Sequence, residues 1–533
     1  MRIRLLQPLL CALFMLVAIT AYAAAEKPDE VLRFDISRFQ IEGNTLIDNA
    51  EIEKKLEPFT GKAKDFGTVQ EALDALEQTY RDRGFSMVVV TLPEQELERG
   101  VVILKVMEVR IGKITIEGNR FFEQNNILRS LPGLRPGETP DINTVSRSLK
   151  LANDNPAKKT NLQLKDSGEE NKTDAILTVQ DEKPWKLGIN GDNTGTRETG
   201  TARMGFLLQH ANVFNRDHLL TLQYITSPEK IDHVSIYSLG YRVPFYSLGS
   251  SLELIGAYSN VDSGTISVAA NNMNVSGKGS ILGIHYNQNL TRISSYEHKV
   301  TLGLDYRAYE NNVDFLGNQL GKNVTVHPLS LTYTGILSFD KINGGFYLMD
   351  MQNIAGSWDG RDNASDFEGA RAGASRGYNI LRYGANLSYV LGADWQARML
   401  VNGQYTNDRL VPGEQYGIGG ATSVRGFAER AFSNDQGYSG SVEAYTPDLC
   451  KLFNVSAFQF RLLGFYDRGY VSRNNALPGD TVSTQVAGIG PGLRITDGKR
   501  FSLSVDCGFV VDPPDESTTR WSSAWHLSAS LLF

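Results

Sequence analysis

The pattern closest to a catalytic motif is a Gly-x-Ser-x-Gly match centred on Ser375. Residues 373–377 read GASRG, the pattern of a nucleophile elbow, in which the serine occupies a sharp turn between a strand and a helix. The residues that follow, 383–391, alternate like a strand, so the helix is missing. A chain with 51 glycines produces such a match by chance. We therefore expect Ser375 to have no catalytic role.

No other set of residues has the spacing of an enzyme or a metal site. Residues 317–322 resemble a phosphate-binding loop, but one residue is missing and Asn323 stands where Ser or Thr is required. The seven histidines are scattered, with neither an HExxH pattern nor paired cysteines. A net charge of −7 without a basic block argues against nucleic acid as a partner. We expect no enzyme activity, metal or cofactor.

The most specific segment is the glycine-rich stretch 419–427, which reads GGATSVRGF. It lies in a region from about 411 to 435 that contains too much glycine for a lipid-spanning strand. Arg425 stands at its centre, flanked by Val424, Gly426 and Phe427. Burying a guanidinium is strongly unfavourable unless an anion accompanies it. The loop therefore requires a carboxylate partner if it is buried.

An alternating run at 458–470 supplies that partner. One parity of the run is apolar, and the other carries Phe465, Asp467 and Gly469. If the apolar parity faces lipid, Asp467 points into the lumen of a barrel. We predict an Arg425–Asp467 ion pair that holds the loop inside the barrel.

The region after Lys183 predicts the wall that such a loop needs. Runs of about ten residues alternate apolar with polar or small residues and are separated by Gly, Asn, Asp and Ser clusters, as at 252–258 and 395–401. The chain ends at Phe533 in a strand with an aromatic, apolar parity, as expected where one face lies in lipid. Residues 183–533 are long enough for about sixteen spanning strands. A soluble β-sandwich or β-helix also alternates, but fits the terminal strand less well.

The region before the barrel contains an internal repeat. The tetrapeptide at Ile41–Asn44 recurs at Ile116–Asn119, 75 residues later. In the first copy, a capping box of Thr68 and Glu71 predicts a helix that ends at Gly84. Strands are expected at 87–92 and 101–109 in the first copy, and a helix at 144–152 with strands at 161–164 and 175–180 in the second. The order predicts two β-α-α-β-β domains, over 34–109 and 110–182.

The first 25 residues have the features of a secretory signal peptide. Arg2 and Arg4 precede an eleven-residue apolar run, and small residues suited to cleavage follow at 21–25. Export implies a compartment in which disulfides form. We nevertheless expect Cys450 and Cys507 to remain unpaired, because Cys507 lies on an apolar strand face while Cys450 follows a turn.

These features together resemble the TpsB transporters of two-partner secretion, the FhaC/ShlB/HecB hemolysin secretion/activation group of the BamA-like superfamily. The resemblance covers essentially the whole mature chain. It rests on the loop and wall motifs, the two POTRA-like repeats and the first barrel region, 191–200. One departure is visible: only about eight residues, 26–33, precede the first strand, where family members often carry a plug helix. The folded-in loop is therefore expected to obstruct the pore.

The resemblance implies a membrane all-β barrel of about sixteen antiparallel strands, preceded by two periplasmic α+β POTRA domains. It also implies an outer-membrane transporter that captures an unfolded exoprotein with an N-terminal TPS-type secretion domain, hemolysin-like or adhesin-like, and translocates it without ATP. Outer-membrane lipid and the barrel assembly machinery are the other expected partners, and Phe533 is the expected C-terminal barrel signal. An assembly factor that inserts other barrels, a passive channel and a lipid-modifying enzyme are the alternatives, in that order.

Overall fold

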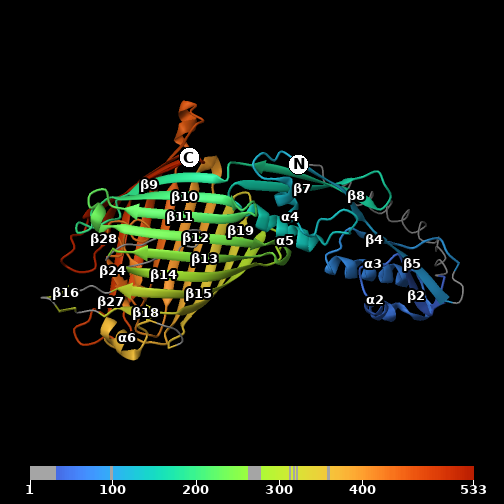
Figure 1. Ribbon diagram of the computed structural model, residues 1–533, viewed down its shortest axis with the longest axis horizontal. Coiled ribbons are helices and arrows are strands. Elements are labelled where there is room, and N and C mark those ends of the chain that lie inside the picture. The colour runs from blue at the N-terminus through green and yellow to red at the C-terminus, as the bar shows by residue number, and fades with distance from the viewer. Residues whose placement is uncertain are drawn as a thin grey trace, which may run out of the picture. The chain divides into compact units, whose positions relative to one another are not determined.

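The computed structural model describes residues 32–96, 100–261, 278–310, 314–315, 318–319, 322–356 and 360–533 (Figure 1). These residues form two compact units. The first comprises the residues up to Lys113 with 135–142 and 166–174, and the second comprises 114–134, 143–165 and 175–533. The expected signal peptide, most of the 26–33 segment and part of the 317–322 match lie outside the described residues. Within the described residues, no helix has both the length and the apolarity needed to span a membrane.

The first repeat copy is a small α+β module. Its three-stranded sheet has the order β2–β5–β4, with β2 parallel to β5, and a separate pair joins β1 to β3. Its elements are β1 (Phe34–Ile36), β2 (Arg38–Glu42), α2 (Asn49–Leu56), η1 (Glu57–Phe59), β3 (Gly61–Lys64), α3 (Phe66–Asp82), β4 (Val88–Thr91) and β5 (Val101–Glu108). Buried residues of α3, among them Leu76 and Tyr80, pack against Val102 and Leu104 of the sheet.

The start of α3 corrects one prediction. The predicted capping box placed the N-cap at Thr68, but the helix begins at Phe66 and its N-cap is Asp65. The Asp65 carboxylate accepts hydrogen bonds from the Thr68 N–H and hydroxyl, both at 2.9 Å. These two hydrogen bonds hold the pKa of Asp65 below its usual value. A carboxylate also interacts favourably with the positive end of the helix dipole, which explains why the aspartate caps the helix.

The second repeat copy has a three-stranded sheet of order β6–β8–β7, which makes β7 an edge strand. Its elements are β6 (Arg110–Glu117), α4 (Gln124–Arg129), α5 (Ile142–Asn153), β7 (Lys158–Asp166) and β8 (Lys172–Asp181). Gly43 and Gly118, the shared glycines of the two copies, both have φ +86°, and a Cβ at either would lie within 2.5 Å of a carbonyl oxygen of the last strand. The repeated glycine is therefore required by close backbone approach.

The remaining chain is a closed antiparallel barrel in which β29 pairs with β9. Segments β18 and β19 pair in succession with β15 and form one strand interrupted at His327, so the described residues contain sixteen wall strands. The wall strands are β9 (Trp185–Asp192), β10 (Arg203–Val213), β11 (His218–Thr226), β12 (Ser235–Phe245), β13 (Ser250–Ser259), β14 (Lys278–Asn289), β15 (Tyr296–Glu310), β18 (Val324–Val326), β19 (Pro328–Ser338), β20 (Ile342–Asn353), β21 (Asn379–Val390), β22 (Gln396–Tyr405), β25 (Gln436–Tyr445), β26 (Gln459–Ser472), β27 (Ser483–Thr496), β28 (Phe501–Asp512) and β29 (Ser523–Leu532).

Short elements occupy the connections between these strands. They are η3 (Ile231–His233), η4 (Tyr246–Leu248), β16 (Asp314–Phe315), β17 (Asn318–Gln319), α6 (Ala364–Ala370), η5 (Gly392–Asp394), η6 (Pro412–Glu414), β23 (Tyr416–Ile418), β24 (Phe432–Asn434) and η7 (Leu449–Phe453). These connections reverse the direction of the chain between wall strands, and the strands determine where each connection lies.

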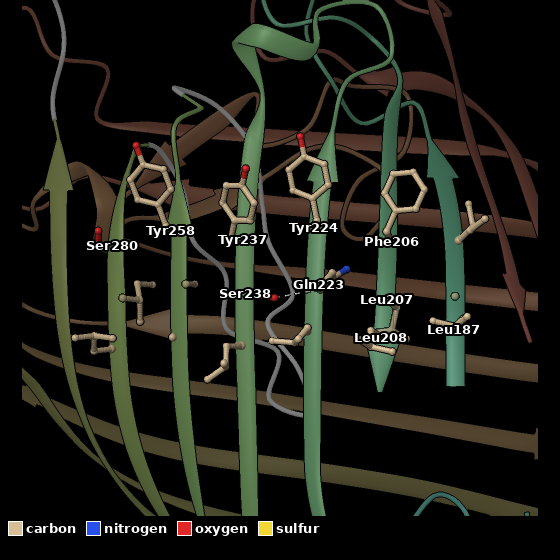
Figure 2. Close-up of a pocket in the computed structure, with 18 of the residues that line it drawn as sticks. Leu187, Phe206, Leu207, Leu208, Gln223, Tyr224, Tyr237, Ser238, Tyr258 and Ser280 are labelled. Carbon is tan, nitrogen blue, oxygen red and sulfur yellow. Dashed lines mark hydrogen bonds between the residues drawn. The ribbon is translucent and has the colours of Figure 1, made fainter. Parts of the chain in front are cut away.

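The outer face of the barrel is apolar. Phe206, Tyr224, Tyr237 and Tyr258 stand directly opposite one another on four neighbouring strands and form one aromatic row (Figure 2). The row borders an apolar hollow of about 950 Å³ over β9–β14, which Phe533 also lines. Wall residues of the other parity include buried polar groups, such as Ser238, Glu253 and His285. This division is typical of a barrel with lipid outside and a polar interior.

Leu239, which is outward and 42% exposed, tests this assignment. We expect Leu239→Arg to lower the free energy of unfolding in lipid vesicles by about 2–4 kcal/mol, because a cation then faces hydrocarbon. The matched control is Gln223→Arg, on the inward parity of the neighbouring strand and opposite Ser238, where the new side chain does not face hydrocarbon. Equal losses in urea titrations of the two variants would contradict the assignment of the outer face.

Candidate functional site

The connection between β22 and β25, residues 406–435, enters the barrel and is the folded-in loop. Strands β23 and β24 pair within it as a short hairpin. The hairpin and the segment between its two strands pack on the inner wall in an apolar cluster of Ile418, Val424, Phe427, Val471, Val486 and Val510. The sequence predicted such a loop around 411–435, and its packing against β26–β28 shows which part of the wall receives it.

Arg425 lies at the far end of the loop, against the carboxylate of Asp467. Its Nε donates to Asp467 Oδ2 at 2.7 Å, and its Nη2 donates to Oδ1 at 2.8 Å. The backbone N–H of Arg425 also donates to Oδ2, at 3.0 Å. Both residues are buried, with exposed fractions of 3% and 0%. A two-pronged guanidinium–carboxylate pair of this kind is specific in geometry as well as strong.

Three further groups surround the same guanidinium. Nη1 lies 2.8 Å from Glu443 Oε1 and 3.5 Å from Asp506 Oδ2. The Arg425 guanidinium carbon lies 3.5 Å from the centre of the Phe465 ring, within cation–π distance. Sequence reasoning missed Glu443 and Asp506, although each lies on the inward parity of its strand. The wall therefore presents three carboxylates to one loop cation, and Arg494 pairs with Asp506 from the other side.

Glycines of the wall make room for the backbone around Arg425. A Cβ at Gly488 would lie 2.0 Å from the Arg425 carbonyl oxygen, and one at Gly508 would lie 2.3 Å from the Gly426 nitrogen. A Cβ at Gly469 would lie 2.8 Å from a methyl of Val424. Gly426 itself has φ +105°, a conformation that favours glycine. The main chain of the loop thus lies directly on the wall.

A family model described as "Haemolysin secretion/activation protein ShlB/FhaC/HecB" matches residues 171–495. The chain belongs to this family. A model for the ShlB-type POTRA domain matches residues 34–108. Members of the haemolysin secretion/activation family are outer-membrane transporters, with the barrel in the outer membrane and the POTRA domains in the periplasm.

Curated relatives agree with this membership, and solved structures share the fold. The heme/hemopexin transporter protein HuxB of Haemophilus influenzae strain 86-028NP is 20% identical over 518 residues, covering 94% of this chain and 87% of the relative. The outer membrane transporter CdiB of Escherichia coli is 23% identical, covering 92% and 82%. The structure of CdiB from Escherichia coli matches with TM-score 0.73 at 19% identity, covering 96% of this chain and 92% of that one. CdiB from Acinetobacter baumannii matches with TM-score 0.67 at 15% identity, covering 98% and 97%.

The other residues singled out from the sequence lie outside the Arg425 cluster. Phe533, the last residue, pairs through its backbone with Leu187 of β9, and its side chain is 65% exposed. Ser375 lies in a turn after α6 and before β21, so the helix of a nucleophile elbow does not follow it. Cys450 and Cys507 are free thiols. Among the residues that the structure describes, no three His, Cys, Asp or Glu side chains are placed so that they could hold a metal ion.

A second buried ion pair joins β7 to the barrel. Lys158 Nζ lies 2.6 Å from Asp217 Oδ2, in the turn between β10 and β11, and both side chains are almost fully buried. The Tyr246 hydroxyl donates to the same oxygen at 2.6 Å. Burial lowers the pKa of Lys158, and Asp217 opposes that shift. Removing one partner of such a pair leaves a buried charge uncompensated, so the start of β7 is firmly fixed to the barrel.

The contacts between the wall glycines and the folded-in loop lead to a specific prediction. Gly488→Ala is expected to displace the Arg425 backbone, because its new methyl group would overlap the Arg425 carbonyl. We expect increased conductance of the purified protein in planar bilayers. Gly464→Ala, on the outward parity of β26 where a Cβ meets no atom within 4 Å, is the control and should behave as the parent. Unchanged conductance in folded Gly488→Ala protein would show that this contact does not hold the loop.

Proposed function

We propose that this outer-membrane transporter captures an unfolded exoprotein in the periplasm and passes it through the barrel lumen to the cell surface. In this proposal, 34–109 and 110–182 are the two capturing POTRA domains and 183–533 is the translocating barrel. Family membership supports the transport of a secreted partner. The hemolysin-like or adhesin-like nature of that partner, the need for barrel assembly machinery and contact with outer-membrane lipid are further parts of the proposal.

The edge strand β7 is the proposed site of capture. An extended client can add a strand to an exposed sheet edge, where main-chain hydrogen bonds give affinity with little demand on sequence. Along β7, residues 163–166 are exposed, while Lys158 at its start is fixed to the barrel by Asp217. A segment added along β7 would therefore lie beside the barrel entrance. Residues 161–164, where the sequence predicts a strand, lie within this edge.

The buried Arg425–Asp467 pair is the observation that carries the mechanism. It holds the far end of the folded-in loop against β26, inside the lumen through which the client is to pass. Transport then requires the loop to leave this position. In a water-filled lumen, released charges are hydrated, which reduces the cost of separating the pair.

The proposal needs no nucleotide and no covalent chemistry. The sequence has no complete phosphate-binding loop, and the proposed driving force is folding of the client outside the cell. Ser375 has no assigned role, so Ser375→Ala should secrete normally.

Comparison of the secreted and outer-membrane proteomes tests the proposal. Strains would carry the parent protein, Arg425→Ala or Arg425→Lys, each checked for a heat-modifiable barrel. We expect loss of one large exoprotein with Arg425→Ala while other barrels stay unchanged, because the loop is then mispositioned. Arg425→Lys keeps the charge but loses the two-pronged geometry, so partial secretion is expected.

Two other outcomes would overturn the proposal. Broad depletion of outer-membrane barrels would instead support an assembly factor. No change in either fraction, with the Arg425→Ala barrel folded, would support a passive channel.

A further inference from the structure

A second buried charge cluster holds the folded-in loop at its base. Glu414 is fully buried, at the end of η6. Arg307 Nη1 donates to its two carboxylate oxygens at 2.8 and 3.1 Å. The Tyr309 hydroxyl donates to Oε1 at 2.7 Å, and Arg382 Nη2 donates to Oε2 at 3.1 Å. Both Glu414 oxygens are thus engaged by donors from the wall.

The cluster extends into the wall on both sides of Glu414. Arg307 also pairs with Asp305 at 2.7 Å, and Asp305 contacts His285 at 2.9 Å. Gln404 donates through Nε2 to the backbone carbonyl of Glu414 at 2.9 Å. The donors come from β15, β21 and β22, whereas the carboxylates around Arg425 come from β25, β26 and β28. Glu414 therefore ties the start of the loop to a different set of wall strands.

Asp435 and an apolar cluster reinforce the same end of the loop. The Asp435 carboxylate accepts from the backbone N–H of Leu410 and of Asn474, both at 2.9 Å, and from the guanidinium of Arg371. Asp435, the last residue of the loop, is thereby connected to Leu410 in the first part of the loop. Leu410 and Val411 are themselves fully buried in an apolar cluster with residues of β15, β18, β20, β21 and α6.

The base of the loop and its Arg425 end differ in the sign of the charge that the loop supplies. At the base, the loop supplies a carboxylate and the wall supplies two arginines. Around Arg425, the loop supplies the arginine and the wall supplies three carboxylates. Neither end can therefore exchange places with the other, which fixes how the loop lies in the lumen. The base adds a link between the first part of the loop and its last residue, because the Asp435 carboxylate accepts from the Leu410 N–H.

We propose that Glu414 is the positioning residue that anchors the folded-in loop, so that transport releases the Arg425 end while the base stays in place. This inference rests on the proposed release of the loop during transport. Its test, however, uses purified protein without a client, so it can fail while secretion still depends on Arg425.

Two cysteine reporters test the anchor. Val411→Cys reports on the base and Val424→Cys on the Arg425 end, and both positions are 0% exposed in the parent. Each reporter is placed in a protein with Cys450 and Cys507 replaced by serine, and its rate of modification by a charged thiol reagent is measured. With Arg425→Ala, we expect the Val424→Cys reporter to react on the order of a hundredfold faster while the Val411→Cys reporter stays protected. With Glu414→Gln, the Val411→Cys reporter should react faster because the base is no longer held, while the Arg425–Asp467 pair still protects the Val424→Cys reporter.

Glu310→Gln is the matched control, since it makes the same change on β15 in a partly exposed residue that pairs with Lys278. It should leave both reporters protected. The anchor would be overturned if Glu414→Gln left the Val411→Cys reporter protected. It would also be overturned if Arg425→Ala exposed both reporters equally. Heat-modifiability on a gel establishes that each variant barrel is folded before the rates are compared.

Discussion

The structure depends on one constraint: a guanidinium that is removed from bulk water must be matched by carboxylates. Arg425 satisfies it with Asp467, Glu443 and Asp506, which come from three different wall strands. Because removing one partner from a buried pair leaves an uncompensated charge, the loop has a strong preference for one position. Wall glycines at 488 and 508 then allow its backbone to lie against the strands. A polar lumen and a packed loop follow from the same requirement.

The periplasmic part of the second unit uses the same chemistry for a different purpose. The Lys158–Asp217 pair and the Tyr246 hydroxyl hold β7 to two periplasmic turns of the barrel. This buried ion pair fixes which strand edge begins at the barrel, because removing either partner would leave a buried charge uncompensated. The Gly43 and Gly118 contacts show the complementary device, in which the absence of a side chain lets two strands approach. Charge pairs and missing side chains together determine how the elements fit.

Much of this organisation could be predicted from the sequence, because alternation within a strand decides which side chains point inward. That pattern was enough to place Asp467 inside and to pair it with Arg425. It could not identify Glu443, Asp506 or Glu414, because their contacts depend on which strands lie beside the loop after the barrel closes. The predicted N-cap of α3 was wrong. Asp65 and Thr68 are both residue types that cap helices, and the charged Asp65 interacts more favourably with the helix dipole. Strand β3 was missed because its sequence, GKAK, has little β propensity and pairs only through β1.

A disulfide between the folded-in loop and the wall tests the central claim most directly. The pair Ile418→Cys and Gly469→Cys suits this purpose, because a Cβ at Gly469 would lie 3.4 Å from the Ile418 Cβ, near the separation that a disulfide requires. Secretion of the exoprotein would be measured with Cys450 and Cys507 replaced by serine, and with each single cysteine as a control. If the loop must leave the wall, the oxidised double variant will not secrete, and a reductant will restore secretion. Normal secretion by the fully oxidised protein would contradict the account.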